Sequence, residues 1–529
     1  MAATCTIVMK YPDRSQILVL GERQIDPEPF IQRRLTLKQI TSDQLNDSDL
    51  TNSSRGIILA PFSGKFRDLD KYFTEFFFPA CELGLMTAAF VDDEATRARV
   101  VSMRDQAYEK YKVGKDIDDT KKREQWISNL PWVYLNENAW AIAETLVRYN
   151  PGPPLKTPFI DTSEMSEPPL EAEYKNLLKR AFHDAERISL KRLAGGKIAK
   201  EAFCVYVNLA NAQYGPQPMP FFVKLGEAWK IEDEKNNYRE VAEPFIPFHL
   251  RPSLNSERSV ANLTTAALVC NFVESAVSLR DALRAGQGQG SIFSLFEITL
   301  RGLRSHTSSV PKKFGVIESF IDLKVRAHEI AEKHQSRIDC LRGEGKTRDP
   351  VEIEKILRGF ASKIETREGP YHGDLHFGNI MVRNRDAILI DYGSMGPFGP
   401  LYADPAVLEV SLVFGTDEHE DPASFETWRK FVDFIFINPL TPPLPSGDYP
   451  QFVWLHKAIR ELRHVVACCG VDEREALIIL AACMLRYGRN LPLPLKKEGL
   501  NILAEKRRTY ALFVAYQICE RLENKNASC

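Results

Sequence analysis

Residues 371–380 of the chain read YHGDLHFGNI, and residues 388–393, a short interval further on, read ILIDYG. These two stretches bring two carboxylates and one carboxamide close together in the sequence, at Asp374, Asp391 and Asn379. The second carboxylate ends a run of β-forming residues. Phosphoryl transfer needs such a set, because an acid orients the acceptor while an Asn and an Asp hold Mg²⁺ against the nucleotide phosphates. We therefore expect a phosphotransferase site in this part of the chain.

The spacing of these residues is similar to that of protein kinases. Asp374 and Asn379 are five positions apart, as are the Asp and the Asn of the kinase catalytic loop H-R-D-x-x-x-x-N. The later Asp391-Tyr392-Gly393 stands where kinases carry D-F-G. The competing interpretation is that His372 and Asp374 only cap a turn.

Length and composition describe a globular protein of several domains. The 529 residues are too many for one ordinary core, so we expect two or three domains. With 44% hydrophobic and 26% charged residues, the composition is that of globular proteins. A net charge of -2 provides no global field toward nucleic acid or an acidic membrane, and we expect neither as a partner.

Three features of the sequence predict a cytoplasmic location. The ten Cys include no C-x-x-C pair, and reduced thiols are expected. The chain starts without the basic and apolar segments of a secretory signal. Its most apolar window, residues 76–91, is shorter than the roughly 20 residues that a membrane-spanning helix requires.

Residues 1–150 alternate short apolar runs with helical patterns, which indicates a small α/β domain of flavodoxin-like or receiver-like outline. The third run ends in Asp92 and Asp93, but Gly21-Glu22-Arg23 after the first run lacks the acidic pair of a working receiver. We expect contact or sensing rather than phosphorelay, with an unrelated α/β scaffold as the alternative. Buried parallel strands are predicted at 17–20, 56–60, 85–91 and 132–135, and helices at 68–83 and 94–111.

A Pro-rich linker, residues 151–174, follows and is expected to hold neither helix nor sheet. Residues 175–275 are β-rich with one helix, and residues 276–529 are mostly helical. A β-rich lobe followed by a helical lobe that contains the catalytic loop is the two-lobed plan of kinases, so we expect an α+β protein. Strands are predicted at 188–194, 202–207, 220–225 and 265–273, and helices at 232–242, 424–435, 451–464, 473–487 and 503–522.

The motif from His372 to Asn379, together with residues 390–393, resembles the aminoglycoside phosphotransferase and choline kinase superfamily, an atypical branch of the protein-kinase-like fold. The resemblance covers about residues 180–520, of which only 371–406 are highly specific. It implies that Asp374 is the catalytic base, which aligns the proton of an acceptor hydroxyl or amine. It also implies that Asn379 and Asp391 bind Mg²⁺ and that ATP is the donor.

The resemblance gives supporting roles to three further residues. His372 supports the catalytic loop, and His376 either lines the acceptor site or braces that loop. Asp404, within Tyr402-Ala403-Asp404-Pro405, resembles an acid that supports the catalytic region. The alternative for Asp404 is a helix N-cap, with Pro405 at the first helical position.

The nucleotide clamp is expected in the β-rich lobe. Lys224, near the end of an apolar run, is predicted to neutralise the α- and β-phosphates, with an exposed edge position as the alternative. Its acidic partner is expected on the helix that follows. Spacing favours Glu234, with Glu232 and Glu240 as alternatives.

Two other segments complete the predicted clamp. Gly195 and Gly196 are predicted to cover phosphates, because adjacent glycines let backbone N–H groups approach phosphate oxygens; a plain hairpin turn is the alternative. Residues 268–273, which include Phe272 and Val273, are predicted to be the strand between the lobes whose backbone meets adenine. An ordinary core strand, or part of a helix, fits the same stretch.

These features together predict an ATP-dependent, Mg²⁺-requiring phosphotransferase with an unidentified acceptor, regulated through the N-terminal domain. A second hypothesis keeps the fold but transfers the phosphoryl group, or AMP, to protein. A third is a nucleotide-binding sensor or adaptor in bacterial signalling or defence, whose N-terminal domain recruits a protein partner. Asp374 favours catalysis, since a module that only binds nucleotide has no chemical need for it.

Overall fold

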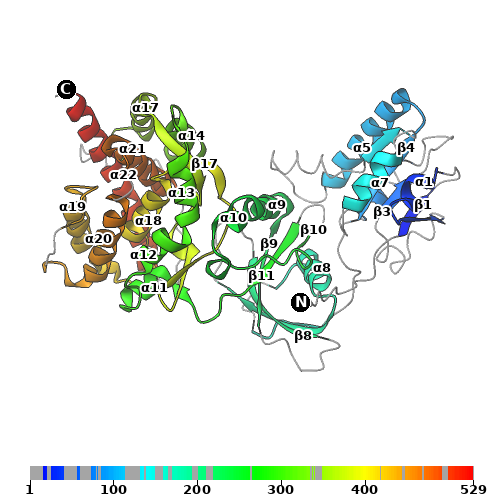
Figure 1. The fold of residues 1–529 in the computed structure, drawn as a ribbon, viewed down its shortest axis with the longest axis horizontal. Helices are drawn as coiled ribbons and strands as arrows, with labels where there is room; N and C mark the ends of the chain where they lie inside the picture. Colours follow the sequence, from blue (N-terminus) through cyan, green and yellow to red (C-terminus); the bar gives the residue numbers. More distant parts are fainter. Residues whose placement is uncertain are drawn as a thin grey trace, which may run out of the picture. The chain divides into compact units, whose positions relative to one another are not determined.

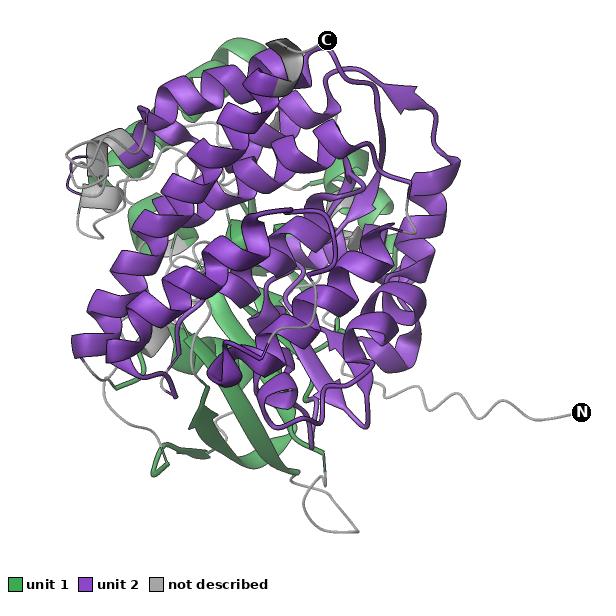
Figure 2. Ribbon diagram, turned by 90° about the vertical axis from the view of Figure 1, so that its left-hand side faces the viewer, with its two compact units in different colours: residues 1–233, 253–272 green, residues 234–252, 273–529 purple. Residues whose placement is uncertain are grey.

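The computed structural model divides the chain into two compact units, Met1–Asp233 with Ser253–Phe272 and Glu234–Pro252 with Val273–Cys529 (Figure 2). The residues that it describes are 16–20, 25–40, 56–59, 69, 73–78, 80, 85–113, 132–135, 139–148, 159–164, 169–193, 201–209, 219–261, 265–333, 336, 339, 348–417, 419–443, 447–467, 470–490 and 498–527.

A parallel five-stranded sheet occupies the N-terminal part of the first unit. It consists of β1 (Gln16–Leu20), β2 (Thr36–Ile40), β3 (Gly56–Leu59), β4 (Met86–Val91) and β5 (Trp132–Leu135), in the order β2-β1-β3-β4-β5 (Figure 1). Each neighbouring pair is parallel, which confirms the predicted parallel strands.

Helices cover both faces of this sheet. Leu18 and Val19, neighbours in β1, belong to two different apolar clusters, because successive side chains of a strand point to opposite faces. One cluster includes Tyr108 of α5 (Glu94–Val113), and the other includes Phe30 of α1 (Glu28–Ile31) and Ile142 of α7 (Ala139–Arg148). Burial on both faces explains why the strands read as continuous apolar runs.

The predicted linker is wrong in one respect, because part of it is regular structure. Phe159–Asp161 form strand β6, which pairs in parallel with β7 (Ala185–Arg192). Helix α8 (Ala172–Ala181) also begins inside the predicted linker. The prolines that motivated the prediction end at Pro158 and resume at Pro168, so they flank this short edge strand without interrupting it.

A second sheet in the first unit has six strands in the order β10-β11-β9-β8-β7-β6. Tyr174 and Leu178 of α8 pack on one face, in a cluster with Val223 of β9. The predicted strands of this region are confirmed as β7, β8 (Glu201–Leu209), β9 (Phe221–Glu227) and β11 (Thr265–Asn271), with ends that differ by a few residues. The short strand β10 (Val260–Ala261) was not predicted.

Helix α9 (Ala228–Asn237) follows β9 and continues into a π-helical turn, Tyr238–Ala242, which confirms the helix predicted at 232–242. The division between the two units passes through α9, after Asp233. Glu234 therefore belongs to the second unit, with the helices that follow.

The second unit is mainly helical, and its four predicted helices are confirmed. Helix α21, most of whose side chains are buried, packs against α14, α18 and α22. No helix among the described residues is both long and apolar enough to cross a bilayer. The main helices are α11 Leu279–Arg284, α13 Arg301–Ser309, α14 Val316–Lys324, α15 Ala327–Lys333, α17 Pro350–Ala361, α18 Ala403–Phe414, α19 Phe425–Phe436, α20 Val453–Ala467, α21 Glu473–Arg489 and α22 Glu498–Ala527.

Two small antiparallel sheets lie among these helices. One has the order β12-β15-β16, from β12 (Val277–Ser278), β15 (Ile380–Arg383) and β16 (Asp386–Leu389). The other has the order β13-β14-β17, from β13 (Lys312–Lys313), β14 (Thr366–Tyr371) and β17 (Gly396–Pro400). The loop between β14 and β15 carries Asp374, and the loop between β16 and β17 carries Asp391.

Candidate active site

The β15–β16 hairpin places two of the predicted site residues side by side. Asn379 directly precedes β15, and Asp391 follows β16 after one residue. Ile380 pairs with Leu389, and the N–H of Ile390 donates to the carbonyl of Asn379 at 3.0 Å. The two ends of the hairpin are thereby held together. Asn379 and Asp391, the two predicted metal ligands, are separated by eleven residues in the sequence but lie close together in the structure.

The hairpin closes by a two-residue turn. Arg383 pairs with Asp386, and the residues between them, Asn384 and Arg385, have φ values of 52° and 76°. Positive φ at both central positions is the type I′ turn, whose twist matches that of the strands on either side.

Asn379 is oriented by the catalytic loop itself. Its side chain is buried, and its Nδ2 donates to the carbonyl of Asp374 at 2.9 Å. Its N–H donates to the carbonyl of His376 at 2.9 Å. Because the amide nitrogen is used in this way, the amide oxygen is the end left for a metal ion.

Asp391 has an unusual backbone conformation, with φ at 62°. Residues other than Gly seldom adopt this left-handed region, although Asp and Asn do so more often than most, and such positions cluster at functional sites. The Oδ1 atom of Asp391 accepts from the N–H of Gly393 at 3.3 Å.

The donor set fits Mg²⁺, which prefers oxygen ligands and usually keeps waters or phosphates in its shell. Asn379 and Asp391 supply one amide and one carboxylate. Within the described residues, no group of three or more His, Cys, Asp or Glu side chains is arranged to hold a metal ion. A Mg²⁺ ion at this hairpin would therefore depend on nucleotide phosphates for the rest of its coordination.

Asp374 is held by an arginine from a distant helix. Arg486 of α21 donates from Nη2 to Oδ1 of Asp374 at 2.7 Å and from Nη1 to the carbonyl of Gly373 at 3.0 Å. Burial alone would raise the pKa of Asp374, but the charge of Arg486, aided by His376, His372 and Lys324, holds that pKa below its usual value. Asp374 is therefore a carboxylate at neutral pH.

The other carboxylate oxygen of Asp374 lies near His376 but is not hydrogen-bonded to it. Its Oδ2 lies 3.9 Å from Nε2 of His376, which is too long for a hydrogen bond. Nδ1 of His376 accepts from the N–H of Gly378 at 3.1 Å and so caps the short 3₁₀-helix Phe377–Asn379. Nδ1 of His376 is thus bound within the loop, and Nε2 is the ring nitrogen on the side of Asp374. Whether His376 braces the loop or lines the acceptor site stays a prediction.

Asp404 fixes the backbone just before Asp374. Its Oδ2 accepts from the N–H of His372 at 2.8 Å and its Oδ1 from the N–H of Gly373 at 2.9 Å. Tyr402 is the N-cap residue of α18, so the alternative that made Asp404 a helix cap is wrong. Burial raises the pKa of Asp404, although the two N–H donors favour its charged form.

His372 is fully buried at the centre of this arrangement. Its Nε2 lies 3.2 Å from the carbonyl of Ile390, the residue before Asp391. The histidine therefore links the loop that carries Asp374 to the residue before Asp391. Its supporting role in catalysis stays a prediction.

Glu234 is linked to the same loop. Its Oε1 accepts from the N–H of Tyr392 at 3.3 Å, and Asn237, one turn further along, donates to the carbonyl of Tyr392 at 3.3 Å. Glu234 is buried, whereas Glu232 and Glu240, the alternatives for this position, are exposed. Its predicted pairing with Lys224 stays a prediction.

Lys224 lies in the first unit and is buried in the middle of the six-stranded sheet. It stands in β9 between Ala202 of β8 and Leu268 of β11, so the alternative of an exposed edge position is wrong. Val223 and Leu225 face the cluster under α8, and Lys224 points to the opposite face.

The remaining residues of the predicted clamp are only partly described. Gly195 and Gly196 lie outside the described residues. β11 ends at Asn271, which confirms a strand over 268–271, and Phe272 follows with its N–H bonded to the carbonyl of Pro220 at 3.2 Å. The division between the units passes between Phe272 and Val273.

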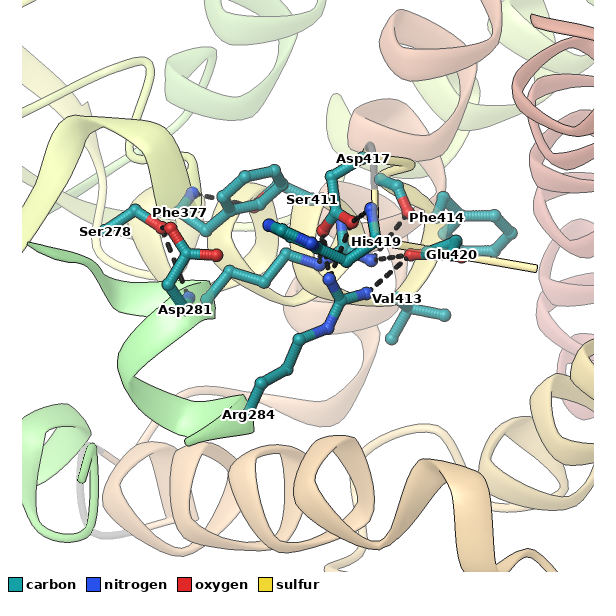
Figure 3. A network of polar contacts seen from close by, with 12 residues as sticks. Ser278, Asp281, Arg284, Phe377, Ser411, Val413, Phe414, Asp417, His419 and Glu420 are labelled. Carbon is teal, nitrogen blue, oxygen red and sulfur yellow. Dashed lines mark hydrogen bonds and ion pairs between the residues drawn. The ribbon is translucent and has the colours of Figure 1, made fainter. Parts of the chain in front are cut away.

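A buried ionic network supports the catalytic loop from one side (Figure 3). The guanidinium of Arg280 lies over the ring of Phe377, 4.9 Å from its centroid, and Phe377 begins the 3₁₀-helix that ends at Asn379. Arg280 also donates to the carbonyl of Gly415 at 2.9 Å. Five charged residues of α11, α22 and the loop after α18 form the ion pairs: Arg280, Arg284, Arg507, Asp417 and Glu420.

Two residues of this site escaped prediction from the sequence, Arg486 and Lys324. Arg486 lies 112 positions from Asp374, on a helix whose pattern is that of a buried core. Lys324 ends α14, where a lysine is ordinary because it complements the helix dipole. No local sequence signal distinguishes either residue.

Comparisons with known proteins give the following. A family described as "Ternary complex associated domain 9" matches residues 325–464, which include Asp374, Asn379 and Asp391. No curated protein matches the chain.

Solved structures similar to the chain include aminoglycoside phosphotransferases and a glucosamine kinase. A thermostable mutant of APH(4)-Ia, in ternary complex with AMP-PNP and hygromycin B, shares 13% identity over 66% of this chain and 98% of that chain, with a TM-score of 0.38. APH(3'')-Id from Streptomyces rimosus shares 16% over 59% and 97%, with a TM-score of 0.35. The glucosamine kinase shares 15% over 66% and 83%, with a TM-score of 0.33.

Proposed function

We propose that the chain is an ATP-dependent, Mg²⁺-requiring phosphotransferase of the aminoglycoside phosphotransferase-like type. One observation carries the proposal. The loop from His372 to Asn379 and the β15–β16 hairpin bring Asp374, Asn379 and Asp391 together, in the order and with the donor types that phosphoryl transfer uses. The acceptor is a hydroxyl or an amine.

In this proposal Asp374 aligns the acceptor. Arg486 occupies its Oδ1, so Oδ2 is the atom that receives the hydrogen bond of the acceptor hydroxyl. A carboxylate whose pKa is held low is a weak base. Phosphoryl transfer passes through a loose transition state, so it depends more on orientation of the acceptor hydroxyl than on complete removal of its proton.

The nucleotide would be held by the remaining site residues. Asn379 and Asp391 would bind Mg²⁺, which when present neutralises charge on the β- and γ-phosphates. Lys224 would neutralise the α- and β-phosphates, with Glu234 as its acidic partner. The burial of Lys224 supports this role, because a buried ammonium is costly unless it has a counter-charge. Gly195 and Gly196 would cover the phosphates, and Phe272 and Val273 would meet the adenine.

The N-terminal sheet supports a regulatory or contact module in the same protein. Its strand order and parallel pairing are those of flavodoxin-like and receiver-like sheets. We propose that this domain binds a protein partner or senses a signal that controls transfer. The buried free thiols of Cys204, Cys270, Cys483 and Cys519 support the cytoplasm as the compartment.

Transfer of label from γ-labelled ATP in cell extract tests the proposed reaction. Wild type is expected to label a metabolite or a protein, and Asp391→Ala is expected to abolish the label. Asp386→Ala, an exposed acid of the same hairpin, serves as the matched control and should leave labelling intact. Absence of both label and Mg–ATP binding by calorimetry in the wild type would refute the proposal.

A nucleotide-binding sensor or adaptor is the second candidate. The ion pair between Arg486 and Asp374 favours it, because an arginine on the carboxylate weakens a catalytic base. The two functions are separated by two substitutions. If Asp374→Asn leaves the biological activity intact while Lys224→Ala abolishes it, nucleotide binding matters and transfer does not.

A further inference from the structure

Lys324 places an ammonium group directly beside the proposed catalytic residue. It ends α14 and is half-buried, and its Nζ lies 5.8 Å from the centroid of the Tyr371 ring. A Cβ built on Gly373 would lie 3.3 Å from the same Nζ. The ammonium therefore rests against the backbone that leads into Asp374.

The carboxylates near Lys324 are already engaged elsewhere. Both oxygens of Asp404 accept backbone N–H groups, and Oδ1 of Asp374 accepts from Arg486. Lys324 forms no ion pair with any residue that the structure describes. A half-buried ammonium without a carboxylate partner is costly. Burial, with the charge of Arg486, accordingly lowers the pKa of Lys324 to about 8.

We propose that the acceptor substrate carries an anionic group, a carboxylate or a phosphate, which binds at Lys324 while its reacting hydroxyl or amine meets Asp374. The inference rests on the proposed phosphotransferase function and adds the chemical class of the acceptor to it. Lys324 is a specificity-determining residue in this arrangement, and Arg486 adds a second positive charge beside it.

The γ-phosphate of the nucleotide is the other source of an anion at this position. Its charge is met in the proposed site by Mg²⁺ at Asn379 and Asp391. Lys324 instead adjoins Gly373 and Asp374, the residues assigned to the acceptor. We therefore assign the anion to the acceptor, and the experiment distinguishes the two sources.

Titration with sulfate tests this assignment, because sulfate keeps its charge across the relevant pH range. Calorimetry is performed on the full chain saturated with Mg–AMP-PNP, in which the γ-position is filled. The wild type should bind sulfate saturably. Lys324→Met should weaken that binding roughly tenfold or more, as expected for loss of a charge-assisted contact. Lys363→Met, which removes an exposed lysine of the same unit, is the matched control and should bind as the wild type does.

Three outcomes would overturn the inference. The first is that the wild type shows no saturable sulfate binding. The second is that Lys324→Met binds sulfate as tightly as the wild type does. The third is that the wild type binds sulfate when it is saturated with ADP but not when it is saturated with AMP-PNP. The last would assign the anion to the γ-phosphate. Lys324→Arg keeps the charge and should retain binding, so it decides the question if the Met variant does not fold.

The same titration separates the two proposals. Failure of Mg–AMP-PNP to bind would refute the phosphotransferase function. Normal nucleotide binding, together with the same sulfate affinity in the wild type and in Lys324→Met, would refute only the anionic acceptor.

Discussion

The carboxylate of Asp404 accepts the backbone N–H of Gly373 at 2.9 Å, and its second oxygen takes the preceding N–H. Helix α18 thereby fixes the backbone from which Asp374 projects. Asp404→Ala would leave two buried donors without an acceptor, and we expect a loss of about 2–4 kcal/mol in the free energy of unfolding, measured with urea. Asp404→Asn keeps one acceptor oxygen, so its free energy of unfolding should lie between those of Asp404→Ala and the wild type. Equal stability of all three would contradict this role.

Gly373 should not tolerate a side chain. Its φ is 75°, and a Cβ there would meet the carbonyl oxygen of Ser394 at 2.3 Å. Gly373→Ala is expected to displace the catalytic loop and abolish phosphoryl transfer. Gly286 has a φ of 71° but open space around it, so Gly286→Ala should incur only the cost of the left-handed backbone, about 1 kcal/mol, and keep activity. Similar activities of the two variants would argue against the clash.

Arg463 and Glu409 form an ion pair in which both side chains are 1% exposed, with 2.6 Å between Nη2 and Oε1. Glu409→Ala leaves a buried guanidinium without its counter-charge, and we expect a loss of about 3–5 kcal/mol in chemical denaturation. Glu426→Ala breaks the exposed pair with Arg429 and should cost less than about 1 kcal/mol. A loss at Glu409 no larger than at Glu426 would contradict the expectation.

Removal of Arg486 should change the pH profile of the site. The charge of Arg486 helps to hold the pKa of Asp374 below its usual value, against the effect of burial. In Arg486→Met that pKa should rise, so the acidic limb of kcat/KM for Mg–ATP turnover should move to higher pH. Arg489→Met, on the same helix, is the control. An unmoved acidic limb would show that Arg486 does not act through Asp374.

Sulfate affinity in the wild type should fall as the pH rises past the pKa of Lys324, about 8, because only the ammonium form attracts the anion. The groups that face Lys324 are Arg486, Asp374, Asp404, Cys483 and Tyr371. Burial raises the pKa of the Cys483 thiol to about 12 and that of Tyr371 above its ordinary value, so neither group loses its proton near pH 8. A bound anion favours the ammonium, so the fall should begin somewhat above the value for the unliganded protein. A flat profile in calorimetry would exclude Lys324 as the binding group.

Stability should move in the opposite direction over the same range. The folded-state pKa of Lys324 is lowered, so between about 8 and its ordinary value the unfolded chain binds more protons, and stability rises with pH.

Much of the fold could be predicted because its signals are local. The parallel strands of the N-terminal sheet are buried on both faces and read as apolar runs, and α21 reads as a core helix. The linker prediction failed because Pro158 and Pro168 suggested a structureless segment, whereas the nine residues between them leave room for β6. A parallel partner such as β7 cannot be read from three residues.

In the candidate site, too, the residues close together in the sequence could be predicted, whereas those brought in by tertiary packing could not. Asp374, Asn379 and Asp391 lie in one short loop and its hairpin, so their spacing in the sequence predicts that they meet. Arg486 comes from a helix that only tertiary packing brings to Asp374, and its charge could not be assigned from the sequence. The choice between a cap and a support for Asp404 depended on where α18 begins, a boundary that propensity places poorly.

The turn at Asn384 and Arg385 lies at the opposite end of the hairpin from Asn379 and Asp391. A residue added to each strand beside the turn would extend the hairpin outward and leave Asn379 facing Ile390. A residue added to one strand alone would exchange the two faces of that strand and draw the metal ligands apart. Divergent homologues should therefore vary this interval in steps of two, and a search pattern that fixes its length would overlook them.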